Sequence, residues 1–237
     1  MKTFYLLLLV PLLVFCTAKK DVDAEEVAVE EEIEVEILKE KWISLFDGKT
    51  TEGWHNYLKD NVNGWEVENG VLFTKGGSGD LVSDAEFENF ELVFEWRIDE
   101  KCNSGVFFNI IEDPKYSTPY LTAPEYQLID DEGYPAELEE GQKTGANYAL
   151  HPPSVKANKP AGEWNTGKII VNQGKVEHWL NGQQTVSYEL WIDEWKELVA
   201  STKFKDMPEY GKANTGPIGL QDHGDAVYFK SIKIKKL

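Results

Sequence analysis

The sequence is poor in the residues that cross-link small exported domains or bind metals. It contains two cysteines, Cys16 and Cys102, four histidines and a single arginine, Arg97. Because Cys16 lies in the N-terminal apolar segment, no internal disulfide is available once that segment is processed. A glycine-rich phosphate loop, a nucleophile elbow and metal-binding Cys/His spacings are also missing. These absences leave few of the familiar catalytic signatures, so function has to be sought in scattered polar residues.

Long hydrophobic runs are scarce, and the apolar stretch 4–15 is too short to span a bilayer. With a basic start before it and small residues after it, this stretch predicts a secretory signal peptide over 1–18. Residues 13–16 resemble a bacterial lipobox, which would make Cys16 the lipidated N-terminus, although Phe15 stands where that pattern usually has a small residue. We therefore expect an exported, lipid-anchored periplasmic or cell-surface protein. Cleavage after Ala18 is the alternative, and it would give a soluble periplasmic protein.

Charge is strongly one-sided, with 42 acidic against 24 basic residues and a net charge of −18. Residues 19–40 are low in complexity and rich in glutamate, so we expect an extended acidic tether between the anchor and a folded domain. A docking tail for a basic partner is the other interpretation. The negative charge argues against nucleic acid and against anionic lipid surfaces as partners.

The remaining residues, 41–237, predict a single all-β domain. Residues 88–99 alternate between apolar and polar side chains, as expected for a half-buried strand. Turn signals at 69–70, 173–174 and 181–182 indicate hairpins, and only 190–201 has helical spacing. The pattern predicts a two-sheet antiparallel β-sandwich with one short helix. The segment 112–166 is long, rich in proline and irregular, which is typical of loops that carry function.

The most informative segment is 216–225, where a short apolar strand ends in Gln221, Asp222 and His223. Imidazole is the side chain whose ordinary pKa suits proton transfer near neutral pH. A strand end would hold it firmly between the carboxylates of Asp222 and Asp225. A His/Asp turn that merely stabilises a hairpin explains the same residues.

Other polar residues fall at positions that suit sugar binding. Arg97 shares the polar face of its strand with Glu95, which indicates either a ligand-binding sheet surface or a structural ladder with a neighbouring strand. Gly105 would leave room above the sheet beside Asn103. Glu125 and Gln127 lie two apart on one strand face, and the long loop supplies Tyr148, Trp164 and Asn165. Turn, core or surface roles are the alternative for each of these residues, and we expect His178 to be structural.

An ordinary two-carboxylate glycosidase is not the natural interpretation. Retaining enzymes of the two-layer β type typically carry alternating acidic residues on one strand. Here Val93 separates the nearest candidates, Glu91 and Glu95.

Over nearly all of residues 42–237 the chain resembles the 3-keto-disaccharide hydrolase domain family of bacterial secreted proteins. The resemblance runs in order through many short motifs: 45–49, 53–54, 65–70, 90–97, 103–107, 125–127, 162–165, 178–182, 201–204 and 219–224. It departs at Asn109, where the family pattern leads us to expect an arginine. The resemblance implies a sandwich, or jelly roll, of the concanavalin A-like lectin/glucanase type.

The resemblance also implies a chemistry in which a carbonyl at C3 of a sugar acidifies the neighbouring C2 proton. Loss of this proton gives an enediolate that expels the C1 substituent, and water then adds, for a net hydrolysis of a 3-keto-glycoside or disaccharide. One base and an oxyanion stabiliser are needed. On matching positions His223 is the expected base, with Glu125 as a competing base, while Arg97 and Lys203 stabilise the enediolate.

The expected substrate-binding residues hold hydroxyls or stack on the sugar; they are Asn103, Gln127, Tyr148, Trp164, Asn165, Gln221 and Asp222. No cofactor is required, although a divalent metal held by His223, Glu125 or Asp222 would suit an enediolate. Two other classes remain open at this point: a non-catalytic carbohydrate-binding module on the bacterial cell surface, and a periplasmic scaffold without a ligand. Neither would need a base.

Overall fold

The computed structural model describes residues 42–237, so the predicted signal peptide, Cys16 and the acidic tether lie outside the described residues. The larger of two sheets has eight strands in the order β11-β10-β9-β6-β13-β4-β3, with β1 also paired to β13. Its strands are β1 (Trp42–Ser44), β3 (Trp65–Glu68), β4 (Val71–Thr74), β6 (Phe90–Ile98), β9 (Asn165–Asn172), β10 (Lys175–Leu180), β11 (Gln183–Glu189) and β13 (Val227–Lys236).

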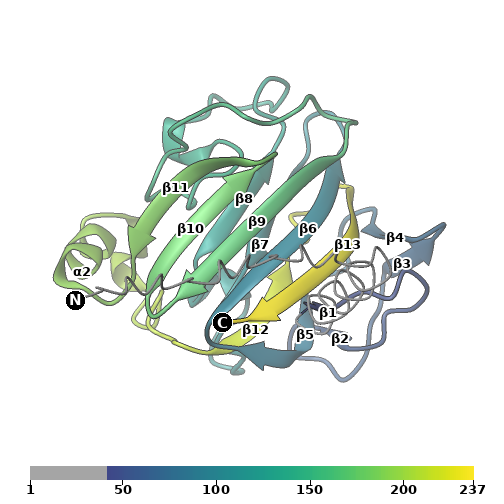
Figure 1. The fold of residues 1–237 in the computed structure, drawn as a ribbon, viewed down its shortest axis with the longest axis horizontal. Helices are drawn as coiled ribbons and strands as arrows, with labels where there is room; N and C mark the ends of the chain where they lie inside the picture. Colours follow the sequence, from purple (N-terminus) through teal and green to yellow (C-terminus); the bar gives the residue numbers. More distant parts are fainter. Residues whose placement is uncertain (1–41) are drawn as a thin grey trace, which may run out of the picture. The chain divides into compact units, whose positions relative to one another are not determined.

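The smaller sheet has five strands in the order β2-β5-β12-β7-β8. Its strands are β2 (Trp54–Asn56), β5 (Leu81–Phe87), β7 (Asn103–Phe107), β8 (Glu125–Ile129) and β12 (Gly216–Leu220). Every named strand pair is antiparallel. In Figure 1 the larger sheet lies in front of the smaller one, which confirms the predicted sandwich.

Among residues 42–237, helical structure is confined to α2 (Asp193–Ala200) and three short 3-10 turns, η1 (Pro119–Leu121), η2 (Glu140–Gln142) and η3 (Lys203–Asp206). The helix confirms the helical spacing of 190–201. Within residues 42–237 no helix is long and apolar enough to cross a membrane.

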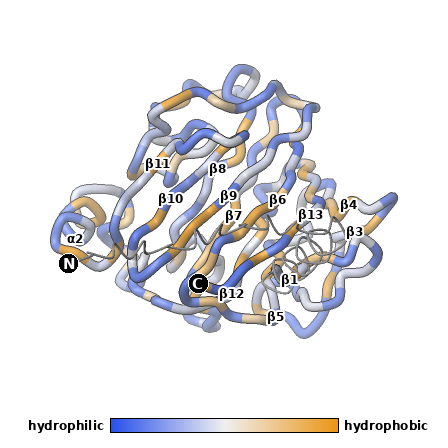
Figure 2. Tube along the Cα trace, in the orientation of Figure 1, coloured by the Kyte–Doolittle hydropathy of each residue, from blue (hydrophilic) through white to orange (hydrophobic). Residues whose placement is uncertain are grey.

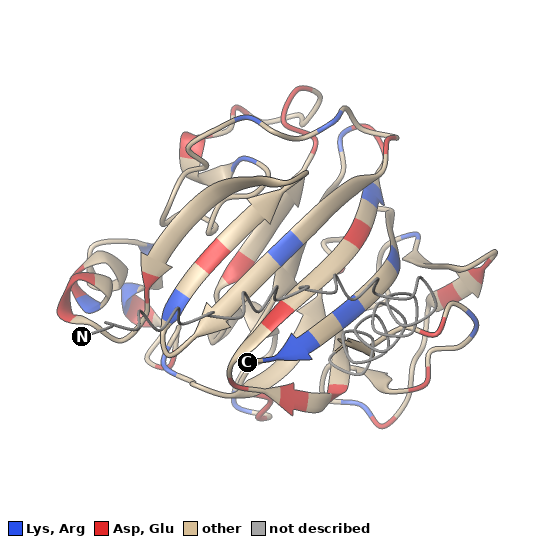
Figure 3. Cartoon of the chain, viewed as in Figure 1, with Lys and Arg blue, Asp and Glu red and all other residues tan. Residues whose placement is uncertain are grey.

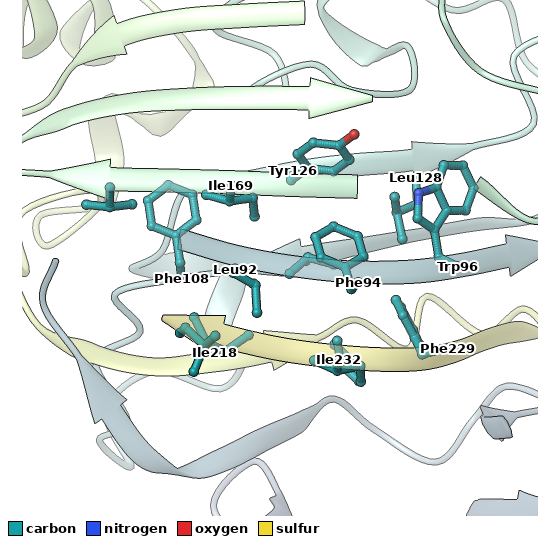
Figure 4. Close-up of a cluster of buried hydrophobic side chains, with 14 of the residues drawn as sticks. Leu92, Phe94, Trp96, Phe108, Tyr126, Leu128, Ile169, Ile218, Phe229 and Ile232 are labelled. Atoms are coloured by element: carbon teal, nitrogen blue, oxygen red, sulfur yellow. The ribbon is translucent and has the colours of Figure 1, made fainter. Parts of the chain in front are cut away.

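The core forms because apolar and polar residues alternate along the central strands, as the colours of β6 and β13 show in Figure 2. Along β6 every second side chain is buried, beginning with Phe90. Figure 4 shows side chains of both sheets meeting there, with Phe94 and Trp96 from the larger sheet near Tyr126 and Leu128 from the smaller. Burying a side chain of this size contributes roughly 1.5–3 kcal/mol, so the core is the main source of stability.

The polar residues of β6 lie on the outward face of the larger sheet, where they form ion pairs. Glu95 pairs with Lys230 at 3.2 Å, and Glu91 pairs with Lys235 at 2.8 Å across the β6–β13 ladder. Figure 3 shows acidic and basic positions interleaved along the strands of the sheet that faces the viewer. This face is the structural ladder that the sequence offered as one of two interpretations.

Three strands were not predicted from the sequence: β1, β2 and β5. The strand β5 carries Ser83 and Asp84 in its middle. Its first three side chains are buried, the next three are exposed and the last, Phe87, is buried again. Such a strand lacks the alternation of apolar and polar residues by which a half-buried strand is recognised in a sequence. The omission matters because β5 begins directly after a residue of the site described below.

Candidate functional site

A polar pocket of about 390 Å³ opens on the smaller sheet. We call it the polar pocket, and it is lined by Asp80, Asn103, Thr118, Tyr120, Glu125, Gln127, Tyr148, Gln221, Asp222 and His223. Seven of these ten residues were predicted from the sequence as site residues. Asp80, Thr118 and Tyr120 were not.

Strand alternation directs Glu125 and Gln127 of β8 to the pocket, while Tyr126 and Leu128 between them enter the core. Gly105 on the neighbouring strand β7 makes room for Glu125. A Cβ atom at residue 105 would lie 2.3 Å from Oε1 of Glu125, so only glycine fits without displacing the carboxyl group. Gly105 thus leaves space above the sheet, as predicted, and the Glu125 side chain fills that space.

Glu125 is almost completely enclosed, with 3% of its surface exposed. Burial first, and the nearby Asp80 carboxylate second, raise its pKa to about 8, against weaker opposing effects of Lys203 and of a hydrogen bond with Gln221. At neutral pH the carboxyl group is therefore mostly protonated and can donate a hydrogen bond.

Asp80 is the second carboxyl group of the pocket and the main residue that sequence reasoning missed. Burial raises its pKa to about 6, while a hydrogen bond from the backbone N–H of Asp222 (2.9 Å to Oδ1) opposes the rise. At neutral pH it is mostly ionised, yet more basic than an exposed aspartate. The two carboxyl groups thus differ in protonation, which is the arrangement that acid–base pairs use.

Amide groups form another part of the pocket wall. Nε2 of Gln127 donates to Oδ1 of Asn103 at 3.2 Å. The Oε1 atoms of Gln127 and Gln221 are buried and have no hydrogen-bond partner among residues 42–237. Buried carbonyl oxygens without partners are costly, and a ligand that donates hydroxyl protons would satisfy them.

Lys203, the first residue of η3, approaches the pocket through the tyrosines. Its Nζ donates to the hydroxyl of Tyr148 at 2.9 Å and lies 4.0 Å from the centre of that ring. Burial lowers the pKa of Lys203, but hydrogen bonds with Tyr148 and Tyr120 outweigh it, so the pKa lies above its ordinary value. The lysine stays charged, and its hydrogen bond polarises the O–H bond of Tyr148, which lines the pocket.

Asp222 and His223 occupy different positions in the wall. The carboxylate of Asp222 accepts hydrogen bonds from the backbone N–H groups of Gly77 (3.0 Å), Ser78 and Gly79 (2.9 Å). It therefore fixes the loop that leads into Asp80. His223 is exposed at the rim of the pocket.

The structure does not bring Arg97, Trp164 or Asn165 to the polar pocket, which corrects the predicted grouping. The guanidinium carbon of Arg97 lies 4.1 Å from the ring centre of Tyr228 and 5.6 Å from that of Trp164. Alternation places Arg97 on the outer face of the larger sheet, so the whole core separates it from β8. Asn165 is 2% exposed, and its Oδ1 accepts from the backbone N–H of Lys159 and from Asn181.

His178 has the structural role that the sequence suggested. It is fully buried on β10, and desolvation lowers its pKa to about 3, so it stays neutral between aromatic rings.

The pocket offers oxygen ligands that suit hard divalent cations, chiefly the carboxylates of Asp80 and Glu125 with the carbonyl of Gln221. Within residues 42–237, however, no three His, Cys, Asp or Glu residues converge on one point. The divalent metal at His223, Glu125 or Asp222 stays a prediction.

Comparison with known proteins places the chain in a family. Residues 41–235 match the model of the 3-keto-alpha-glucoside-1,2-lyase-like domain. The chain belongs to this family. A Bacteroides thetaiotaomicron protein named 3-keto-disaccharide hydrolase is 32% identical over 93% of this chain and 90% of its own length. Membership confirms the predicted family and the predicted class, a glycoside-cleaving enzyme.

Crystal structures of two Parabacteroides distasonis proteins, each described as a candidate glycosyl hydrolase, are also similar to the chain. One is 42% identical with a TM-score of 0.81, covering 85% of this chain and 96% of its own. The other is 29% identical with a TM-score of 0.64, covering 83% of this chain and 100% of its own. The sandwich is thus shared with two proteins that are described as candidate glycosyl hydrolases.

Proposed function

We propose that the polar pocket cleaves 3-keto-glycosides by removing the C2 proton, eliminating the C1 substituent and adding water to the resulting double bond. Family membership and the name of the Bacteroides relative support the substrate class. The observation that carries the mechanism is the pair of carboxyl groups, Asp80 and Glu125, whose pKa values are raised to about 6 and about 8 in one pocket.

The first step needs a base at C2 and a hydrogen-bond donor at the C3 oxygen. Asp80 is mostly ionised at neutral pH and accepts the proton, while protonated Glu125 donates to the oxygen on which the enediolate charge develops. A carboxyl group kept neutral by burial is a strong donor to such an oxyanion. This assignment places the base inside the pocket, whereas the sequence placed it at His223 with Glu125 as the competing base.

The second step breaks the C1–O bond as the enediolate collapses to a C1=C2 double bond conjugated with the C3 carbonyl. The leaving oxygen takes a proton, which His223 at the rim or the Lys203–Tyr148 pair supplies. In the last step the hydroxyl group of water bonds to C1, and Asp80 returns a proton to C2 after exchange with solvent. The remaining proton of water replaces the one given to the leaving oxygen, so both groups return to their starting states. One water is consumed, so the sum is a hydrolysis.

Binding rests on the amide oxygens and on the size of the pocket. Asn103, Gln127 and Gln221 hold sugar hydroxyls, and the edge formed by Tyr120 and Tyr148 covers one side of the ring. A volume of about 390 Å³ suits one sugar ring and part of the group at C1. A carbohydrate of this kind is the proposed partner of the protein, which we also propose to be exported and lipid-anchored at Cys16.

Kinetics of two variants with a 3-keto-glucoside test this proposal. Glu125→Gln should lower kcat by about 10²–10³-fold, the usual effect of weakening one oxyanion donor. Asp80→Asn should lower it by about 10²–10⁴-fold, as expected for loss of a general base. Each change replaces a carboxyl group with an amide of nearly the same size, so neither should unfold the domain.

Glu86→Gln on β5 is the matched control, because Glu86 is exposed and does not line the pocket. Its kcat should equal that of the wild type. Unchanged turnover in both Glu125→Gln and Asp80→Asn would refute the assignment. Saturable sugar binding without any turnover in the wild type would favour the non-catalytic carbohydrate-binding module.

A further inference from the structure

A second cavity, of about 610 Å³, lies between α2 and the segment 203–212. We call it the aromatic cavity, because rings of Trp191, Trp195, Phe204 and Tyr210 form its walls. The rings of Phe204 and Tyr210 are stacked with centres 4.0 Å apart, and Trp195 continues the stack at 6.3 Å from Tyr210. Phe204, Tyr210 and Trp195 pack on one another and are almost completely buried, so the accessible apolar lining comes from Trp191, Val199, Met207 and Pro208. Such a lining suits a small apolar ligand.

The aromatic cavity is separate from the polar pocket. The two share no lining residue. Phe204 on one side packs against Tyr120 on the other, with ring centres 5.7 Å apart. A ligand can therefore occupy one cavity while the other is empty.

Charge at the mouth of the aromatic cavity opposes the charge of the whole chain. Its lining includes three lysines, Lys196, Lys205 and Lys212, and no aspartate or glutamate. The polar pocket, in contrast, is lined by three acidic residues and no lysine. In a chain with a net charge of −18, such a basic rim around an apolar floor selects for an anion.

The lysines are available to a ligand. Lys196 and Lys212 pair with Asp193 (2.8 Å) and Glu209 (3.7 Å) at exposed positions, where such pairs contribute little. Lys205 makes no ion pair with any residue of 42–237 and is exposed.

We propose that the aromatic cavity binds a small apolar carboxylate, with its apolar body against Trp191, Val199 and Met207 and its carboxylate at the lysine rim. The walls account for the apolar body, and the lysines with the absence of acidic residues account for the charge. This site does not depend on the proposed chemistry of the polar pocket.

Calorimetric titration with 2-naphthoate and its neutral analogue 2-naphthamide tests the site. The wild type should bind naphthoate at least about tenfold more tightly than naphthamide, the gain expected from charge-assisted hydrogen bonds. Lys196→Gln combined with Lys205→Gln should remove this preference and leave naphthamide binding unchanged. Val199→Trp, which fills the cavity, should abolish binding of both probes, with folding checked by circular dichroism.

Two controls locate the ligand. Lys59→Gln removes an exposed lysine that does not line the cavity and should bind like the wild type. Glu125→Gln should also leave naphthoate binding intact. Equal affinity for the two probes, no binding by the folded wild type, or binding that survives Val199→Trp would each overturn the proposal.

Discussion

At the scale of single residues, Glu125 concentrates the chemistry of the site. The residue is 3% exposed, and its carboxyl group lies near the carboxyl group of Asp80. Burial is the largest cause of its raised pKa. The cause of this burial is local, since Gly105 allows the side chain to lie against the neighbouring strand. One glycine thus sets the protonation state of the acid on which the proposed mechanism depends.

The pH dependence of turnover follows from the two carboxyl groups. Asp80 must be ionised, so kcat should rise as the pH passes about 6, and Glu125 must be protonated, so kcat should fall above about 8. Because the two carboxyl groups interact, the acid and alkaline limbs of the pH profile report apparent pKa values of the pair and not of either residue alone. A pH series of kcat for the wild type and Glu125→Gln measures this.

In Glu125→Gln the alkaline limb should disappear while the acid limb remains. A wild-type profile that is flat between about pH 5 and 9 would contradict the assignment. So would an alkaline limb that is unchanged in the variant.

At the scale of elements, the end of β12 holds the pocket together. Asp222 follows this strand and accepts backbone hydrogen bonds from the loop 77–79, while its own N–H donates to Asp80. The strand end therefore sets the position of a carboxyl group that lies 142 residues away in the sequence.

Asp222→Asn should loosen this loop, because an amide NH₂ would face backbone N–H groups that now donate to a carboxylate oxygen. We expect the free energy of unfolding to fall by about 1–3 kcal/mol and KM to rise as Asp80 loses its position. Urea unfolding and steady-state kinetics measure the two effects. Asp60→Asn, in an exposed loop, is the control, and a variant as stable as the wild type would show that the loop is held by other contacts.

The sequence could predict the part of the site that strand alternation fixes. Glu125 and Gln127 share a face because they lie two apart, and Asn103 and Gln221 stand at strand ends beside them. Asp80 could not be predicted, because the strand after it has polar residues in its middle and no regular period. Whether Arg97 lies near the pocket depends on which outer face of the sandwich carries the pocket. The residue pattern of a single strand cannot show this.

At the scale of the whole molecule, the two outer faces of the sandwich have different roles. The smaller sheet carries the polar pocket, and the larger sheet carries a ladder of ion pairs with Arg97 between Tyr228 and Trp164. Core side chains fill the space between the faces, as Figure 4 shows. We therefore predict that the chain's one arginine contributes to stability and not to turnover.

Arg97→Gln tests this division. Loss of the stacking on Tyr228 should lower the free energy of unfolding by about 1 kcal/mol, while kcat stays within about twofold of the wild type. Urea unfolding and kinetics on a 3-keto-glucoside give both numbers. A fall in kcat of more than about tenfold in a folded variant would return Arg97 to the catalytic group and contradict the assignment of the pocket.

The central claim is that the pocket removes the C2 proton before the C1 bond breaks. Incubating the full chain with a 3-keto-glucoside in heavy water, and following the reaction by proton NMR, tests it most directly. We predict that the sugar product carries deuterium at C2 and that the aglycone is released, with both signals lost in Glu125→Gln and Asp80→Asn. Release of the aglycone while C2 keeps its proton would contradict the account.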